Sequence, residues 1–169
     1  MSFNNTINLD TQKLDYDEDD VYDELTLECN TEFVKEFYLN KLEHNNNLLL
    51  LDIRESTELP AGYIPQAQHL ALSIIKNDTG FQFTNQLIKQ LSEFVANNIE
   101  AHIVFYCAGG VRSLYLVQYL YDFLIHQHHS AEFNILQNKI YSMQGGFKKW
   151  VFENKPTEDN NKLINIFLK

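Results

Sequence analysis

Residues 102–125 read HIVFYCAGGVRSLYLVQYLYDFLI, an apolar run followed by a loop of small residues and a second apolar segment. The run 102–107 is typical of a strand buried on both faces of a parallel sheet, because it lacks the alternation of a half-exposed strand. Segment 114–125 is apolar almost all round, which predicts a helix packed in the interior. This stretch therefore predicts an α/β domain, with Cys107 at the carboxyl end of a buried strand.

The rest of the chain repeats this alternation. A second buried strand is predicted at 48–53 (LLLLDI), and a clear apolar stripe predicts an amphipathic helix over 84–98. Shorter segments predict strands at 25–28, 69–72 and 138–143, helices at 31–43 and 147–154, a turn-rich loop at 60–65, and an added strand or an edge loop within 128–139. The order of these elements favours an α/β sandwich around a mostly parallel sheet.

Charge is distributed unevenly along the chain. The 169 residues carry a formal charge of −10, and residues 1–24 hold eight of the 23 acidic residues but only one of the 13 basic ones. An acidic chain is not expected to bind nucleic acid or anionic lipid non-specifically. We expect 1–24 to be a flexible or loosely docked acidic extension, with partner binding as an alternative role, 25–156 to be one domain, and 157–169 to be a C-terminal tail.

No segment predicts export or membrane insertion. The start of the chain, MSFNNTINLDTQ, has neither the basic nor the apolar region of a signal peptide, and no window approaches the roughly 18 apolar residues of a membrane span. We therefore expect a cytoplasmic protein with no membrane partner, in which both cysteines are reduced thiols. For Cys29 we expect an ordinary packing role, with a resolving cysteine as the alternative.

The loop CAGGVR, residues 107–112, is expected to carry the chemistry, because ligands bind at the carboxyl ends of strands in such sheets. Gly109 and Gly110 let backbone N–H groups turn inward as an anion nest, and the following helix adds its positive end. Such surroundings lower the pKa of a thiol, which makes Cys107 a candidate nucleophile, and the Arg112 guanidinium can bind a two-oxygen anionic group. The alternative for a single cysteine is a small buried hydrophobic residue.

Three motifs in this chain resemble, in their order and spacing, the rhodanese family of sulfurtransferases, and the resemblance runs over roughly residues 25–156. They are LLLLDIRESTELPAGYIPQA (48–67), FYCAGGVRS (105–113) and YSMQGGFKKW (141–150). They are similar to the family's strand with Asp-x-Arg and a Gly-His-Ile-Pro-Gly-Ala loop, to its active-site loop, and to its late strand with a double glycine and Trp. The resemblance implies a three-layer α/β/α sandwich around a mostly parallel five-stranded sheet.

The resemblance also implies a sulfur transfer in two steps. The Cys107 thiolate takes a sulfane sulfur from a donor, thiosulfate or a persulfide, and the resulting persulfide yields it to a thiol or to cyanide. The implied substrate-binding residues are Ala108, Gly109, Gly110, Val111, Arg112 and Ser113. The implied supporting residues, which would fix the shape of the loop without reacting, are Asp52, Arg54, Gly145 and Gly146. Neither a metal nor another cofactor is implied.

Two other functions stay open, a non-catalytic rhodanese-like binding or regulatory module and a phosphatase or arsenate reductase of the same fold. Cys107 and Arg112 enclose four residues, as in the sulfurtransferases, whereas the related phosphatases enclose five and carry His where this chain has Tyr106. The loop holds no further Lys or Arg, which predicts weak binding of thiosulfate. A protein persulfide or a small thiol is then the expected natural partner.

Overall fold

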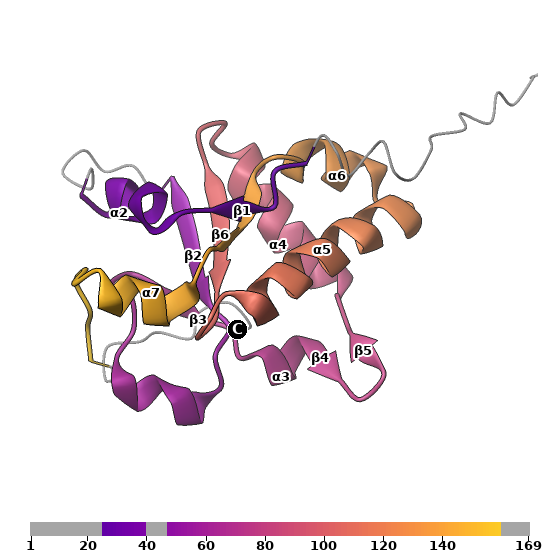
Figure 1. Cartoon of the computed structure of the whole chain (residues 1–169). Helices are drawn as coiled ribbons and strands as arrows, with labels where there is room; N and C mark the ends of the chain where they lie inside the picture. The colour runs from indigo at the N-terminus through magenta and orange to yellow at the C-terminus, as the bar shows by residue number, and fades with distance from the viewer. Residues whose placement is uncertain (1–24, 40–46, 160–169) are drawn as a thin grey trace, which may run out of the picture.

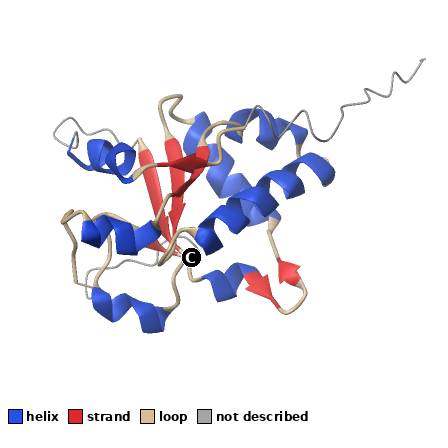
Figure 2. Cartoon of the chain, in the orientation of Figure 1, coloured by secondary structure: helices blue, strands red, loops and turns tan. Residues whose placement is uncertain are grey.

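A five-stranded sheet in which every strand is parallel to its neighbours forms the centre of the molecule (Figure 2). The computed structural model describes residues 25–39 and 47–159. In spatial order the strands are β1 (Glu28–Cys29), β7 (Ile140–Met143), β6 (His102–Tyr106), β2 (Leu48–Asp52) and β3 (Gln68–His69). The predicted five-stranded, mostly parallel sheet is confirmed, and its two longest apolar runs, β2 and β6, are neighbours.

Helices cover both faces of this sheet. They are α2 (Thr31–Leu39), the 3-10 helix η2 (Ser56–Ala61), α3 (Leu72–Ile75), α4 (Asn85–Ala96), α5 (Val111–His126), α6 (Ser130–Leu136) and α7 (Gly146–Phe152). Figure 1 shows α2 and α7 on one side of the sheet and α4, α5 and α6 on the other. The predicted three-layer sandwich is therefore confirmed.

Alternate residues of the central strands face two separate cores. Leu49 and Leu51 of β2 belong to the cluster that contains the apolar residues of α4 and α5. Leu50 of β2 and Val104 of β6 belong to a second cluster, with Trp150 of α7. Because both faces are covered, β2 and β6 are apolar at nearly every position, which explains why their sequences show no alternation.

The sequence expectations differ from the structure in two connections. The predicted strand 69–72 is replaced by the two-residue β3, after which Leu72 begins α3 and a small hairpin follows, made of β4 (Lys76–Asn77) and β5 (Gly80–Phe81). The segment 128–139, expected to hold an added strand or an edge loop, contains the helix α6, so this expectation is wrong. Leu136 is fully buried in the core and its carbonyl accepts a hydrogen bond from the Tyr121 hydroxyl at 3.1 Å, so tertiary packing accounts for the helix.

A residue beyond 156, the expected end of the domain, is bonded to the body of the molecule. The N–H and the carbonyl of Glu158 are both hydrogen-bonded to the backbone of Tyr63 at 2.9 Å, and the Tyr63 hydroxyl donates to the Glu158 carboxylate at 3.0 Å. The expected extension 1–24, the end of the predicted helix 31–43 and the tail from residue 160 lie outside the described residues. Among the helices of the described ranges, none has the length and apolar character needed to cross a membrane.

Candidate active site

Cys107 follows directly on β6 and stands before the helix α5, at the carboxyl end of the sheet. The loop turns at Gly110, whose φ of 92° is one that a side chain disfavours. This turn brings the Gly110 N–H to within 3.1 Å of the Cys107 Sγ, to which it donates a hydrogen bond. The residue itself is only 1% exposed, so the sulfur lies below the surface of the molecule.

Hydrogen bonds from the loop and from the first turn of α5 favour the ionised form of this thiol. Burial raises the pKa of Cys107, but the Ser113 hydroxyl, at 3.6 Å, and the N–H groups of Ser113, Gly110 and Gly109 lower it by more, so the net shift is downward. The Ser113 hydroxyl is itself held 2.7 Å from the Ser142 hydroxyl of β7. A sulfur at this position is therefore surrounded by donors suited to a negative charge.

The double glycine lets the start of α7 approach the back of the loop. The N–H of Phe147 donates to the Cys107 carbonyl at 2.8 Å, and the N–H of Lys148 donates to the Ala108 carbonyl at 2.9 Å. Gly146 has a φ of 57°, and a Cβ there would lie 2.4 Å from the Cys107 carbonyl oxygen, while Gly145 has a φ of 73°. No other residue type fits at Gly146 without displacing the loop.

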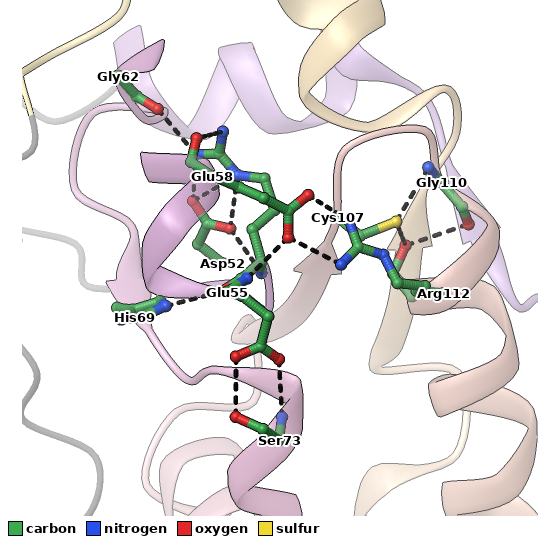
Figure 3. Close-up of polar contacts among 11 residues, drawn as sticks. Asp52, Glu55, Glu58, Gly62, His69, Ser73, Cys107, Gly110 and Arg112 are labelled. Carbon is green, nitrogen blue, oxygen red and sulfur yellow. Dashed lines mark hydrogen bonds and ion pairs between the residues drawn. The ribbon is translucent and has the colours of Figure 1, made fainter. Parts of the chain in front are cut away.

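Arg112 points toward an acidic partner that the sequence analysis did not identify. Its Nη1 donates to Glu58 Oε2 at 2.9 Å and its Nη2 donates to Oε1 at 2.6 Å (Figure 3). Hydrogen bonding to the guanidinium is the main cause that lowers the pKa of Glu58 to about 2. The pKa of Arg112 is raised, first by the hydrogen bond to Glu58 and further by the negative charges of Glu58 and Cys107. The expected anion-binding arginine thus already holds a carboxylate of the chain itself.

Glu58 is fixed from its other side by the start of η2. The Glu55 N–H donates to Glu58 Oε2 at 2.8 Å, and the Glu55 carboxylate accepts hydrogen bonds from the Ser73 N–H at 2.9 Å and hydroxyl at 2.8 Å (Figure 3). The bond from the Glu55 N–H to the Glu58 side chain is part of a capping box at the start of η2, and the Ser73 bonds hold Glu55 in addition. Glu58 stands at the third position of the box, where Glu is usual, but Glu55 is not a usual N-cap residue, and nothing in the sequence pointed to the contact of Glu58 with Arg112. Ser142 gave no signal, since it reads as an ordinary strand residue.

Asp52 and Arg54 form a buried ion pair beside the loop. Arg54 Nη2 lies 2.6 Å from Asp52 Oδ2, and both side chains are almost completely buried. The Tyr106 hydroxyl donates to the same carboxylate at 2.7 Å, Arg54 Nη2 also donates to the Gly62 carbonyl at 2.8 Å, and the guanidinium lies 4.0 Å from the centre of the Phe147 ring. The pair thereby links β2, β6, the segment after η2 and α7 around the Cys107 loop.

Comparison with known proteins identifies the family. Residues 35–153 match the rhodanese-like domain family, which is well over half of the chain. The chain belongs to the rhodanese-like domain family. It is 27% identical over 116 residues to the Bacillus subtilis (strain 168) protein named "Putative sulfurtransferase YtwF", an alignment that covers 69% of this chain and 85% of that protein.

Solved structures with this fold include proteins of different activities. The thiosulfate sulfurtransferase from Pseudomonas aeruginosa matches with a TM-score of 0.50 at 18% identity, over 79% of this chain and 20% of that one. The As-Sb reductase from Leishmania major matches with a TM-score of 0.53 at 15% identity, over 75% of this chain and 77% of that one. At these identities the matches show the shared rhodanese-like fold alone.

The second cysteine of this rhodanese-like domain lies in different surroundings. Cys29 ends the edge strand β1, two strands away from β6, and packs against the core that contains Val34. Burial is the main cause that raises the pKa of Cys29 to about 12, so this thiol stays protonated at neutral pH. In the described ranges, no group of three or more His, Cys, Asp and Glu is placed to hold a metal ion.

The two thiols are expected to differ sharply in alkylation. The pKa of Cys107 lies below the ordinary 9.0 and that of Cys29 near 12, so raising the pH ionises Cys107 first. Iodoacetamide near pH 8 should therefore add one group, on Cys107, as measured by peptide mass spectrometry. The rate should reach half of its plateau below pH 9. Modification of Cys29 first, or a half-plateau above pH 9, would contradict the assignment of the low pKa to Cys107.

Proposed function

We propose that this rhodanese-like domain is a sulfurtransferase that carries a sulfane sulfur as a persulfide on Cys107. The observation that carries the proposal is the Cys107 sulfur, placed at the end of β6 with a lowered pKa and a hydrogen bond from the Gly110 N–H. The family match and the similarity to a protein named as a sulfurtransferase support the same reaction class. A nucleophilic thiolate needs neither a metal nor an organic cofactor for this chemistry.

The reaction proceeds by two displacements at sulfur. In the first, the Cys107 thiolate attacks the sulfane sulfur of a donor, a new S–S bond forms, and the donor leaves with the electron pair of its broken bond. In the second, an acceptor thiolate or cyanide attacks the outer sulfur of the Cys107 persulfide and releases the thiolate. The N–H of Gly110 and the hydroxyl of Ser113 are positioned to stabilise the negative charge on Cys107 before and after each displacement.

The donor class that the site favours is a persulfide, on a protein or on a small thiol. Arg112 is paired with Glu58, and the described residues of the active loop offer no second cation to a dianionic donor such as thiosulfate. The formal charge of −10 further opposes the approach of a dianion. Thiosulfate is therefore expected to act as a weak donor.

The proposal is tested by the intact mass of the protein after incubation with an alkyl persulfide and removal of excess donor. One added sulfur, located on the Cys107 peptide and removed by cyanide as thiocyanate, is the expected result. The same preparation should not hydrolyse an aryl phosphate. Turnover of the aryl phosphate with no sulfur added would favour the phosphatase reading. If the folded protein shows neither sulfur addition nor phosphate hydrolysis, the result would favour a non-catalytic module.

A further inference from the structure

The salt bridge between Arg112 and Glu58 engages the guanidinium that is expected to bind an anionic donor. Its two hydrogen bonds, at 2.6 and 2.9 Å, use the paired nitrogens that a guanidinium offers to a two-oxygen anion. The Arg112 and Glu58 side chains are 36% and 31% exposed, whereas Cys107 is 1% exposed. The ion pair is thus the solvent-facing part of a site whose sulfur lies deeper. A donor that carries an oxyanion binds this edge of the Arg112 guanidinium, Nη1 with Nη2, only by displacing the carboxylate.

The Glu58 carboxylate cannot move far once it is displaced. The backbone of Glu58 belongs to η2, and its backbone carbonyl accepts a hydrogen bond from Arg54 Nη1 at 3.4 Å. The side-chain Oε2 of Glu58 also accepts a hydrogen bond from the Glu55 N–H at 2.8 Å. A carboxylate freed from Arg112 therefore remains at the entrance and repels an arriving anion. The ordinary pKa of a Glu side chain, 4.5, already lies below neutral pH, so a Glu58 carboxylate freed from Arg112 stays ionised at neutral pH and protonation does not relieve this repulsion.

We propose that Glu58 sets the donor specificity of the site by excluding donors whose sulfane sulfur is bonded to an anionic group. This inference rests on the proposed sulfurtransferase function and narrows its donor class. The favoured donor is an alkyl persulfide, R–S–SH, with no carboxylate or sulfonate next to the transferred sulfur. The Cys107 thiolate attacks the outer sulfur of that donor, the S–S bond of the donor breaks, and RS⁻ leaves with its electron pair. The proton of the donor remains with the transferred sulfur or passes to the leaving thiolate.

Glu58→Gln tests this proposal with two donors, thiosulfate and 2-hydroxyethyl persulfide. Glutamine keeps an oxygen that accepts the Glu55 N–H, but it lacks the negative charge that Glu58 places beside Arg112. We expect kcat/KM for thiosulfate to rise by at least about tenfold, chiefly through a lower KM, and kcat/KM for 2-hydroxyethyl persulfide, whose alkyl group is uncharged, to change by less than about twofold. Glu58→Ala should shift the preference between the two donors in the same direction.

A matched control removes the same charge elsewhere. Glu93 lies on the exposed face of α4 in a surface pair with Lys89, and Glu93→Gln should leave the preference between donors unchanged. A readout without turnover is protection of Cys107 from iodoacetamide by sulfate, which should require less sulfate in Glu58→Gln than in the wild type.

The outcomes separate this inference from the proposed function. If the wild type accepts sulfur from 2-hydroxyethyl persulfide but both Glu58 variants keep the wild-type preference and the wild-type sulfate protection, the role of Glu58 is overturned and the proposed function stands. A preference shifted equally by Glu93→Gln would overturn it too, since net charge alone would then explain the effect. If the wild type takes sulfur from neither donor, both proposals are overturned together.

Discussion

Replacing Cys107 by alanine is expected to abolish sulfur transfer, with a fall in kcat/KM of at least about a thousandfold, the scale usual for the loss of a nucleophile. The reason is that no other described thiol can take its place. Cys29 lies at the edge strand, two strands from β6, and its pKa is raised to about 12. The measurement is thiocyanate formation from an alkyl persulfide and cyanide, together with the intact mass of the protein after donor treatment.

The controls for this substitution separate chemistry from folding. Cys107→Ser keeps an acceptor for the Gly110 N–H, so it should fold like the wild type and yet form no persulfide. Cys29→Ala should retain both the added sulfur and the rate. Persulfide carried by the folded serine variant, or transfer lost only in Cys29→Ala, would place the reacting sulfur elsewhere.

Asp52→Asn is expected to lower the free energy of unfolding by about 3–5 kcal/mol, because it leaves the Arg54 guanidinium buried without its countercharge. Arg54 and Asp52 are 2% and 0% exposed, and the carboxylate accepts hydrogen bonds from the Arg54 guanidinium and from the Tyr106 hydroxyl. An amide keeps the shape but can replace only part of these bonds. Urea unfolding followed by circular dichroism measures the loss.

Two comparisons test the cause assigned to that loss. The double variant Asp52→Asn with Arg54→Met removes both charges, so it should be more stable than Asp52→Asn alone. Breaking the exposed pair of Lys89 and Glu93 by Glu93→Gln should cost less than about 1 kcal/mol. A double variant that is less stable than the single one would show that the guanidinium stabilises the fold through contacts other than the ion pair.

Apolar patterning predicted the central layers because burial on two faces leaves a direct mark on the sequence. β2 and β6 are apolar at nearly every position, and α4 has a clear apolar stripe, since each lies against covered surfaces. The small residues between β6 and α5 likewise indicated a tight loop, and Gly110 does turn there with a positive φ.

Elements held by contacts with distant residues were missed. The helix α6 has few residues and depends on the burial of Leu136 and the bond from the Tyr121 hydroxyl to its carbonyl. The hairpin of β4 and β5 also depends on a contact with another element. The ring centres of Phe81 in β5 and Tyr119 in α5 lie 5.0 Å apart. Neither contact leaves a periodic pattern in the segment concerned, which is why the pattern of 128–139 was compatible with a strand or a loop.

The sequence by itself determined the central strands and the main helices, the position of Cys107 at the end of a buried strand and the family to which the chain belongs. Only the tertiary structure decided which distant residues contact Arg112 and Ser113 beside Cys107. Glu58 lies 54 positions before Arg112, and Ser142 lies 29 positions after Ser113, so folding alone brings each pair within hydrogen-bond distance. Local patterns follow from burial and backbone geometry, whereas the charges that meet at an active site depend on how distant segments pack.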